Sequence, residues 1–215
     1  IAKLGALEGE QAVYQRGGIL VSIVKVEDKD VPAGTLKISS LPYPIIRERI
    51  VVAAELGEER ETEEGLKFVP VRPPKWLIDA VANRGQYPSV RSLCGIVQTP
   101  TIRPDGSILQ TPGYDESTGL VFAPLIDYPK VPESPNRQNA VDAAEMLLDV
   151  FQDFPFQDDS DKSANLAKLL TMIGRPAVNG CCPVPATTAT VRGTGKTLLD
   201  CLNSIIAFGK ESAIK

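Results

Sequence analysis

Histidine is absent from the 215 residues of this sequence. Its absence excludes an imidazole general base, the serine–histidine and cysteine–histidine nucleophile pairs, and every metal site that contains histidine. Any chemistry must therefore use Lys, Arg, Asp, Glu, Ser, Thr or backbone groups.

Cysteine and long hydrophobic runs are also scarce. The cysteines Cys94, Cys181, Cys182 and Cys201 lack the paired spacing of a zinc ribbon or of a thioredoxin-type site. We therefore expect a reduced, cytoplasmic protein. The apolar runs are much shorter than the roughly 20 residues of a membrane span, and there is no secretory signal pattern, so we expect no membrane partner. The chain begins with Ile1 instead of Met, and we expect it to be a piece of a longer protein.

The net charge of -4 arises mainly from one segment. Between Glu55 and Gly65 the chain carries 6 glutamates and a single basic residue, Arg60. A solvated loop or a frayed helix face is one interpretation of this run, and a docking site for a basic partner is the other. Because electrostatic footprints are local, the net charge does not exclude binding to nucleic acid.

The first part of the chain has the pattern of a small α+β region. Residues 12–26 predict a hairpin that turns at Gly17 and Gly18. Prolines punctuate residues 31–50 and predict short edge strands and turns without a long helix. Residues 73–85 predict a helix on which Trp76 lies in the apolar stripe, as a core residue or as a platform for base stacking.

Residues 93–122 predict a small antiparallel sheet with two turns. One turn is centred on Pro104-Asp105-Gly106, and the other lies between Thr111 and Asp115. Both segments are interpreted as turn architecture, and contact with DNA is the alternative.

A proline-rich connector follows between Pro124 and Pro135, and it predicts a domain boundary. We expect a mixed α+β connecting domain over residues 1–125, with a small antiparallel sheet and helices. Residues 126–215 would hold a helical segment and the beginning of an α/β P-loop NTPase domain. Apolar spacing predicts helices from about Asn136 to Asp153 and from Ser160 or Asp161 to Gly174. We interpret the acidic residues near Asp158 as loop and capping residues rather than as a cation site.

A glycine-rich loop lies near the end of the chain, between strand-like and helix-like segments. The β-branched run Thr187–Val191 is typical of a buried strand, and Leu198 begins an apolar helical pattern that stops at Gly209. Strand, glycine loop and helix in this order are the context of a phosphate-binding P-loop.

Each residue type of the loop suits a nucleotide. Gly193 and Gly195 let backbone N–H groups converge on phosphate oxygens, and Lys196 would reach the β- and γ-phosphates. The Thr197 hydroxyl would ligate Mg²⁺. The predicted nucleotide-binding residues are therefore Gly193, Thr194, Gly195, Lys196 and Thr197, with ATP and Mg²⁺ as cofactors.

The loop departs from the full pattern at Thr190, where glycine is expected. A degenerate or purely structural strand-turn-helix is therefore the alternative to a nucleotide site. Arg192 is either an additional phosphate contact or a surface charge. Hydrolysis also needs an acidic residue that holds Mg²⁺, a residue that positions water and usually an arginine. We expect these to belong to the longer parent, so the catalytic residues stay unassigned.

Several segments together resemble phage and mobile-element primase-helicase replication proteins. They are residues 14–21, the block Ser92–Leu120, Asp153–Phe156, Arg175-Pro176 and the loop Gly193–Thr197. The resemblance implies a connecting domain followed by the first strand, P-loop and helix of a superfamily 3 or AAA+ type ring ATPase. It also implies a homo-oligomer in the full-length protein, with single-stranded or forked DNA as its partner.

The predicted function is that of a fragment of an ATP-binding DNA replication protein, in which an ATP-dependent helicase drives unwinding. A non-catalytic DNA-binding or adaptor module with a vestigial P-loop is the alternative. A P-loop regulatory switch unrelated to DNA is a third hypothesis.

Overall fold

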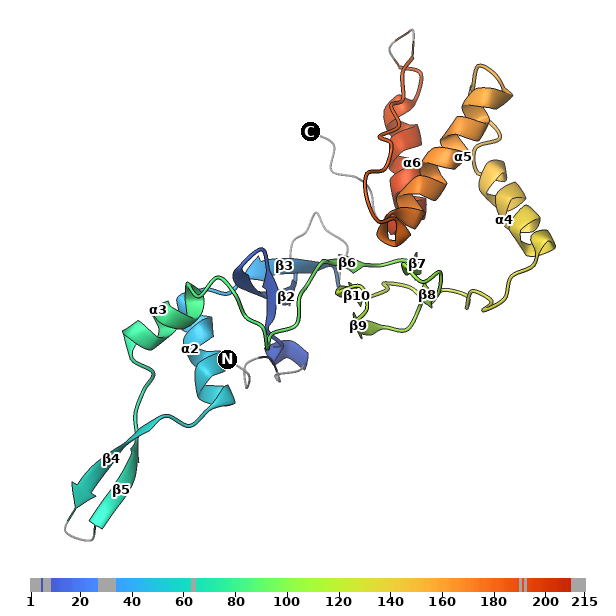
Figure 1. The fold of residues 1–215 in the computed structure, drawn as a ribbon. Coiled ribbons are helices and arrows are strands. Elements are labelled where there is room, and N and C mark those ends of the chain that lie inside the picture. Colours follow the sequence, from blue (N-terminus) through green and yellow to red (C-terminus); the bar gives the residue numbers. More distant parts are fainter. Residues whose placement is uncertain are drawn as a thin grey trace. The chain divides into compact units, whose positions relative to one another are not determined.

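The computed structural model describes Gly5, residues 9–26, 34–62 and 65–189, Val191 and residues 193–209. The described residues form a mixed α+β fold with small antiparallel sheets and five α-helices (Figure 1). Contacts divide the chain into two compact units, Ile1–Ile96 with Gly119–Val121 and Val97–Thr118 with Phe122–Lys215. The domain boundary between residues 125 and 126 stays a prediction.

The first unit opens with the predicted hairpin, which the structure confirms. It contains η1 (Gly9–Gln11) and the antiparallel sheet β1-β2-β3, whose strands are β1 (Tyr14–Arg16), β2 (Ile19–Lys25) and β3 (Leu36–Ser40). Gly17 and Gly18 take φ values of 56° and 80° in the turn between β1 and β2, a conformation that glycine adopts without steric cost.

Two helices pack against this sheet's buried residues. They are α2 (Tyr43–Ala53) and α3 (Lys75–Ala82). We predicted no long helix before Ile50, and this prediction was wrong. Pro42 and Pro44 do not interrupt α2, because Pro42 is its N-cap and Pro44 stands in its first turn, where proline is tolerated. The shared core contains Val13, Leu20, Leu41, Ile46, Ile50, Ile78, Val81, Tyr87 and Val90.

The helix predicted over residues 73–85 is confirmed as α3, but the core placement of its tryptophan is wrong. The Trp76 side chain is 69% exposed, while Ile78 and Val81 of the same helix are buried. Apolar spacing identifies the helix but does not decide which members of a broad apolar stripe reach the core.

The acidic segment is a β-ribbon rather than the loop or helix face that we predicted. Strands β4 (Gly57–Thr62) and β5 (Gly65–Pro70) pair antiparallel, with Glu59 opposite Phe68 and Glu61 opposite Leu66. Leu66 and Phe68 are exposed on this ribbon. Cross-strand pairing therefore overrides the low strand propensity of the glutamates.

Short strands follow, and the predicted turn at Pro104-Asp105-Gly106 is present. The second turn was predicted at the wrong place, because residues 113–115 form a strand and the chain turns at residues 116–119. The strands are β6 (Gly95–Val97), β7 (Thr101–Ile102), β8 (Ile108–Leu109), β9 (Gly113–Asp115) and β10 (Leu120–Phe122), arranged as β7-β8 and β6-β10-β9. The Arg103 guanidinium binds Asp115 at 2.9 Å and also donates to the Ile108 carbonyl. The Arg103 hydrogen bond holds the pKa of Asp115 well below its usual range. These contacts support the interpretation of the segment as turn architecture.

The second unit also contains the three helices nearest the predicted site. They are α4 (Arg137–Asp149), α5 (Asp159–Gly174) and α6 (Lys196–Phe208), with η2 (Arg175–Ala177) after α5. The predicted helices over residues 136–153 and 160–174 are thus confirmed, with Asn136 and Asp158 as N-caps. Phe151, Leu169, Leu199 and Ala207 form the buried cluster of this unit. Among the described residues, no helix has both the length and the apolar character needed to cross a bilayer.

Candidate functional site

The predicted phosphate loop is a glycine turn that opens helix α6. Gly193 and Gly195 both have φ of 83°, and Gly195 is the N-cap of α6. No side chain caps this helix, and the Gly195 carbonyl accepts the first helical hydrogen bond from Leu199 N–H at 2.9 Å. The first N–H groups of a helix have no intrahelical partners, so this end of α6 presents donors and a partial positive charge.

The strand predicted before the loop is not present in the described residues. Thr187, Thr188, Ala189 and Val191 have no strand pairing, and Thr190 and Arg192 lie outside the described residues. A parallel strand requires neighbouring strands for its backbone hydrogen bonds. Because the described part of the chain offers no such neighbour here, no P-loop fold is identified in it, and the expectation of a strand at this point was wrong.

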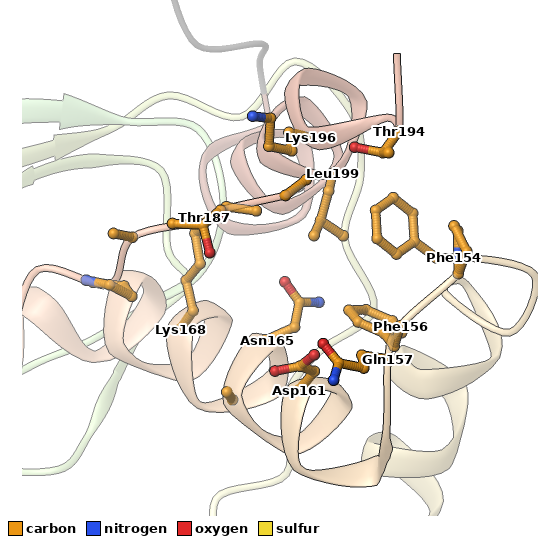
Figure 2. A pocket seen from close by; sticks show the side chains of 16 residues that line it. Phe154, Phe156, Gln157, Asp161, Asn165, Lys168, Thr187, Thr194, Lys196 and Leu199 are labelled. Atoms are coloured by element: carbon orange, nitrogen blue, oxygen red, sulfur yellow. The ribbon is translucent and has the colours of Figure 1, made fainter. Parts of the chain in front are cut away.

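A cavity of about 670 Å³ lies beside the glycine turn, entirely within the second unit (Figure 2). This volume falls in the range of small-molecule and cofactor sites. Phe154, Phe156 and Leu199 supply apolar walls, and Thr194 and Lys196 bring the predicted loop to its edge. The cavity therefore combines apolar surface with the cation and donors that the sequence had indicated.

A partly buried lysine anchors the segment that precedes the loop. Lys168 on α5 donates from Nζ to the Thr187 hydroxyl at 2.9 Å and forms an ion pair with Asp200 on α6. The Thr187 hydroxyl in turn donates to Asp200 Oδ1 at 3.1 Å. This triad ties the extended segment to both helices and fixes one wall of the cavity. Much of the positive charge of Lys168 is already balanced by Asp200.

An asparagine pair links α5 to α6, and one of its members lines the cavity. Asn203 on α6 is fully buried, and its Nδ2 donates to Asn165 Oδ1 on α5 at 2.7 Å. Asn165 is 7% exposed and lines the cavity. Figure 2 shows its side chain between the two phenylalanine rings and Lys168. The bond to Asn203 sets the orientation of the Asn165 amide.

The structure brings only part of the predicted nucleotide site to the cavity. Thr194 and Lys196 line it, whereas Gly193 is exposed and forms the turn, and Thr197 is exposed on the first turn of α6. Gly195 lies against Phe154, whose ring would be 3.3 Å from a Cβ at that position. Within the turn, Gly193, Lys196 and Thr197 are exposed, whereas Thr194 and Gly195 are partly buried.

Sequence reasoning missed the cavity residues outside the loop: Phe154, Phe156, Asn165, Lys168 and Thr187. A usable signal existed for one asparagine, because Asn203 interrupts the apolar stripe of α6 between Leu199 and Ile206. A polar residue on a buried stripe predicts a buried partner. The partner itself lies 38 positions earlier in the chain, and α6 alone does not identify it.

The acidic residues near Asp158 act as the capping prediction states. The Asp158 carboxylate accepts a hydrogen bond from Asp161 N–H at 2.9 Å and so begins α5. In the described parts of the chain, no group of three or more Cys, Asp or Glu side chains is arranged to hold a metal ion. The predicted role of Thr197 toward nucleotide-bound Mg²⁺ does not require such a group, since the phosphates supply ligands.

The chain was compared with known proteins on three levels. No protein-family model, no curated protein and no solved structure matches it.

Proposed function

We propose that the Gly193–Thr197 turn binds the triphosphate of ATP with Mg²⁺, and that the chain is a fragment of a primase-helicase type DNA replication protein. In this proposal α6 and its glycine turn begin the P-loop ATPase domain of a ring-forming parent that acts on single-stranded or forked DNA. Nucleotide binding is assigned to this fragment, and hydrolysis to the complete motor.

One observation carries the proposal: the uncapped glycine turn adjoins a cavity of about 670 Å³. Gly193 and Gly195 both have positive φ, and left-handed residues of this kind occur in the backbone turns that bind anions. Lys196 is exposed and stands at the cavity edge, where its flexible chain can follow a phosphate. The Thr197 hydroxyl is also exposed and accessible to a hydrated Mg²⁺.

Calorimetric titration of the chain with ATP and Mg²⁺ tests the assignment. We expect Lys196→Ala to weaken ATP binding by at least about tenfold, because it removes the only side-chain cation of the predicted loop. Lys130→Ala is the matched control, since Lys130 is exposed and does not line the cavity. Equal ATP affinity of the wild type and Lys196→Ala would refute the nucleotide assignment.

A DNA-binding module with a vestigial loop is the second candidate, and the exposure of Trp76 favours it. Single-stranded DNA binds to exposed aromatic rings by stacking, and Trp76 is the only tryptophan of the chain. Its fluorescence can therefore report binding of an oligonucleotide directly. Salt-dependent quenching that is lost in Trp76→Ala and does not respond to ATP would favour the module over the ATPase fragment.

A further inference from the structure

The cavity extends beyond the glycine turn to groups that a triphosphate alone would not use. Its apolar wall is formed by the rings of Phe154 and Phe156, whose centroids are 4.8 Å apart and whose planes are inclined by 54°. Phe154 borders the glycine turn at Gly195, and Phe156 lies farther from the turn. Asn165 lies beside these rings (Figure 2). Apolar rings with a few oriented polar groups are typical of a site for a flat heterocycle.

Asn165 is the informative residue, because it is more than nine-tenths buried and only half satisfied. Its Oδ1 accepts from Asn203, but its Nδ2 has no hydrogen-bond partner among the described residues. The Nδ2 atom keeps some solvent-accessible surface, since Asn203 Oδ1 and not Asn165 Nδ2 is the fully buried atom of the pair that lacks a partner. A ligand acceptor can therefore replace water at this donor. Since Asn203 fixes the orientation of the amide, the unpaired group that Asn165 can offer a ligand is its Nδ2 donor.

The charged residues of the cavity indicate which end would hold the phosphates of a ligand and which would hold its neutral part. Lys196 stands at the end near the glycine turn, whereas Lys168 is already paired with Asp200. Asp161 lines the cavity near Asn165 and disfavours a phosphate there by like-charge repulsion. The anionic part of a ligand is thus directed to the turn, and a neutral ring to the end formed by Phe156 and Asn165.

We infer that this end of the cavity binds the purine base of the nucleotide, with Phe156 against the ring and Asn165 Nδ2 donating to a ring acceptor. The inference rests on the proposed function, which places the phosphates at the Gly193–Thr197 turn. It assigns recognition of the base to the α5 face of the cavity and makes Asn165 a specificity-determining residue.

The test compares three probes: ATP with Mg²⁺ as the whole nucleotide, inorganic tripolyphosphate with Mg²⁺ as its phosphate part, and adenosine as its base and sugar. Asn165→Leu removes the donor, and Phe156→Leu removes the flat ring while keeping an apolar side chain. Gln152→Leu is the matched control, because it replaces an exposed amide outside the cavity. Circular dichroism and thermal unfolding establish that each variant is folded.

We expect Asn165→Leu and Phe156→Leu to weaken ATP binding by about tenfold or more and to leave tripolyphosphate binding unchanged. Adenosine should bind the wild type at millimolar concentration without competition from tripolyphosphate, as followed by ligand-observed NMR, and Phe156→Leu should abolish this binding. If Asn165→Leu does not fold, Phe156→Leu and the adenosine titration decide the matter alone.

Absence of adenosine binding by the wild type, or equal loss of ATP and tripolyphosphate affinity in Phe156→Leu, would overturn the base assignment. Failure of the proposed function has a different signature, namely that tripolyphosphate does not bind or binds Lys196→Ala as well as the wild type. The two failures are therefore distinguishable in one set of titrations.

Discussion

Asn203 Nδ2 donates a hydrogen bond of 2.7 Å to Asn165 Oδ1, and the pair joins α5 to α6 within the buried part of the second unit. The bond leaves Asn203 Oδ1 buried without a hydrogen-bond partner among the described residues. A buried network that is only partly satisfied is expected to limit stability while specifying how the two helices meet.

A double-mutant cycle measures this contribution. Asn203→Leu alone should lower the free energy of unfolding by about 1–3 kcal/mol, because it leaves Asn165 Oδ1 unpaired. The double variant Asn165→Leu with Asn203→Leu should cost less than the sum of the two single changes, since it removes both polar groups. Urea denaturation followed by circular dichroism gives the values, and strict additivity would contradict a coupled pair.

Lys168 should control the order of the segment that precedes the glycine turn. Lys168→Met keeps much of the buried stem but removes the bonds to Thr187 and Asp200. We expect faster amide hydrogen exchange at residues 187–189 and a loss of stability of about 1 kcal/mol, a modest value because Asp200 is half exposed. Lys162→Met on the same helix is the control and should leave exchange in this segment unaltered.

Tyr87 fixes the end of α3 in the first unit. Its buried hydroxyl lies 2.7 Å from the Val81 carbonyl and 2.8 Å from the Ala82 carbonyl, and these are carbonyls of the last turn of the helix. Tyr87→Phe should lower the free energy of unfolding by about 1–2 kcal/mol in urea. Tyr43→Phe should have a much smaller effect, because the Tyr43 hydroxyl accepts a long, exposed bond from Asn83 at 3.3 Å.

Stability should decrease in acid through the Arg103–Asp115 ion pair. The hydrogen bond from Arg103 lowers the pKa of Asp115 in the folded state, and Thr118 and Ser117 act in the same direction. The folded state therefore binds the proton less readily than the unfolded state, whose pKa is near 3.8. The stabilisation is complete above that value and is lost as the pH falls through the folded pKa.

Asp115→Asn serves as the reference for this pH dependence. We expect the difference in unfolding free energy between wild type and variant to be largest near neutral pH and to shrink below about pH 4. Unfolding curves recorded from pH 7 to pH 2 provide the measurement. A difference that stays constant across this range would show that the ion pair does not contribute through its charge.

The sequence predicts the elements whose signal is local. Gly17 and Gly18 specify a hairpin turn, Asn136 and Asp158 specify helix starts, and Gly209 ends α6 with φ of 73°. Each of these signals acts within a few residues of the structure that it determines. The positions of α3, α4, α5 and α6 follow from such signals and from apolar spacing.

Other features depend on residues far apart in the chain, and they could not be predicted. The strand character of β4 arises from pairing with β5, and the exposure of Trp76 depends on which face of α3 meets α2 and the sheet. The cavity is formed by a loop at Phe154, helix α5, the segment at Thr187 and the start of α6. The glycine turn could be identified from its own residues, but its neighbours could not.

The glutamate charges of the β4–β5 ribbon oppose its self-association. Such a ribbon has unpaired backbone donors and acceptors along its edges, and the exposed Leu66 and Phe68 give one face an apolar surface that favours association. Glu59 and Glu61 lie on that same face, so two copies approaching each other at neutral pH bring like charges together. Replacing both glutamates by glutamine would remove this repulsion while leaving the apolar surface in place, so the charge of the ribbon opposes contact between copies through this face.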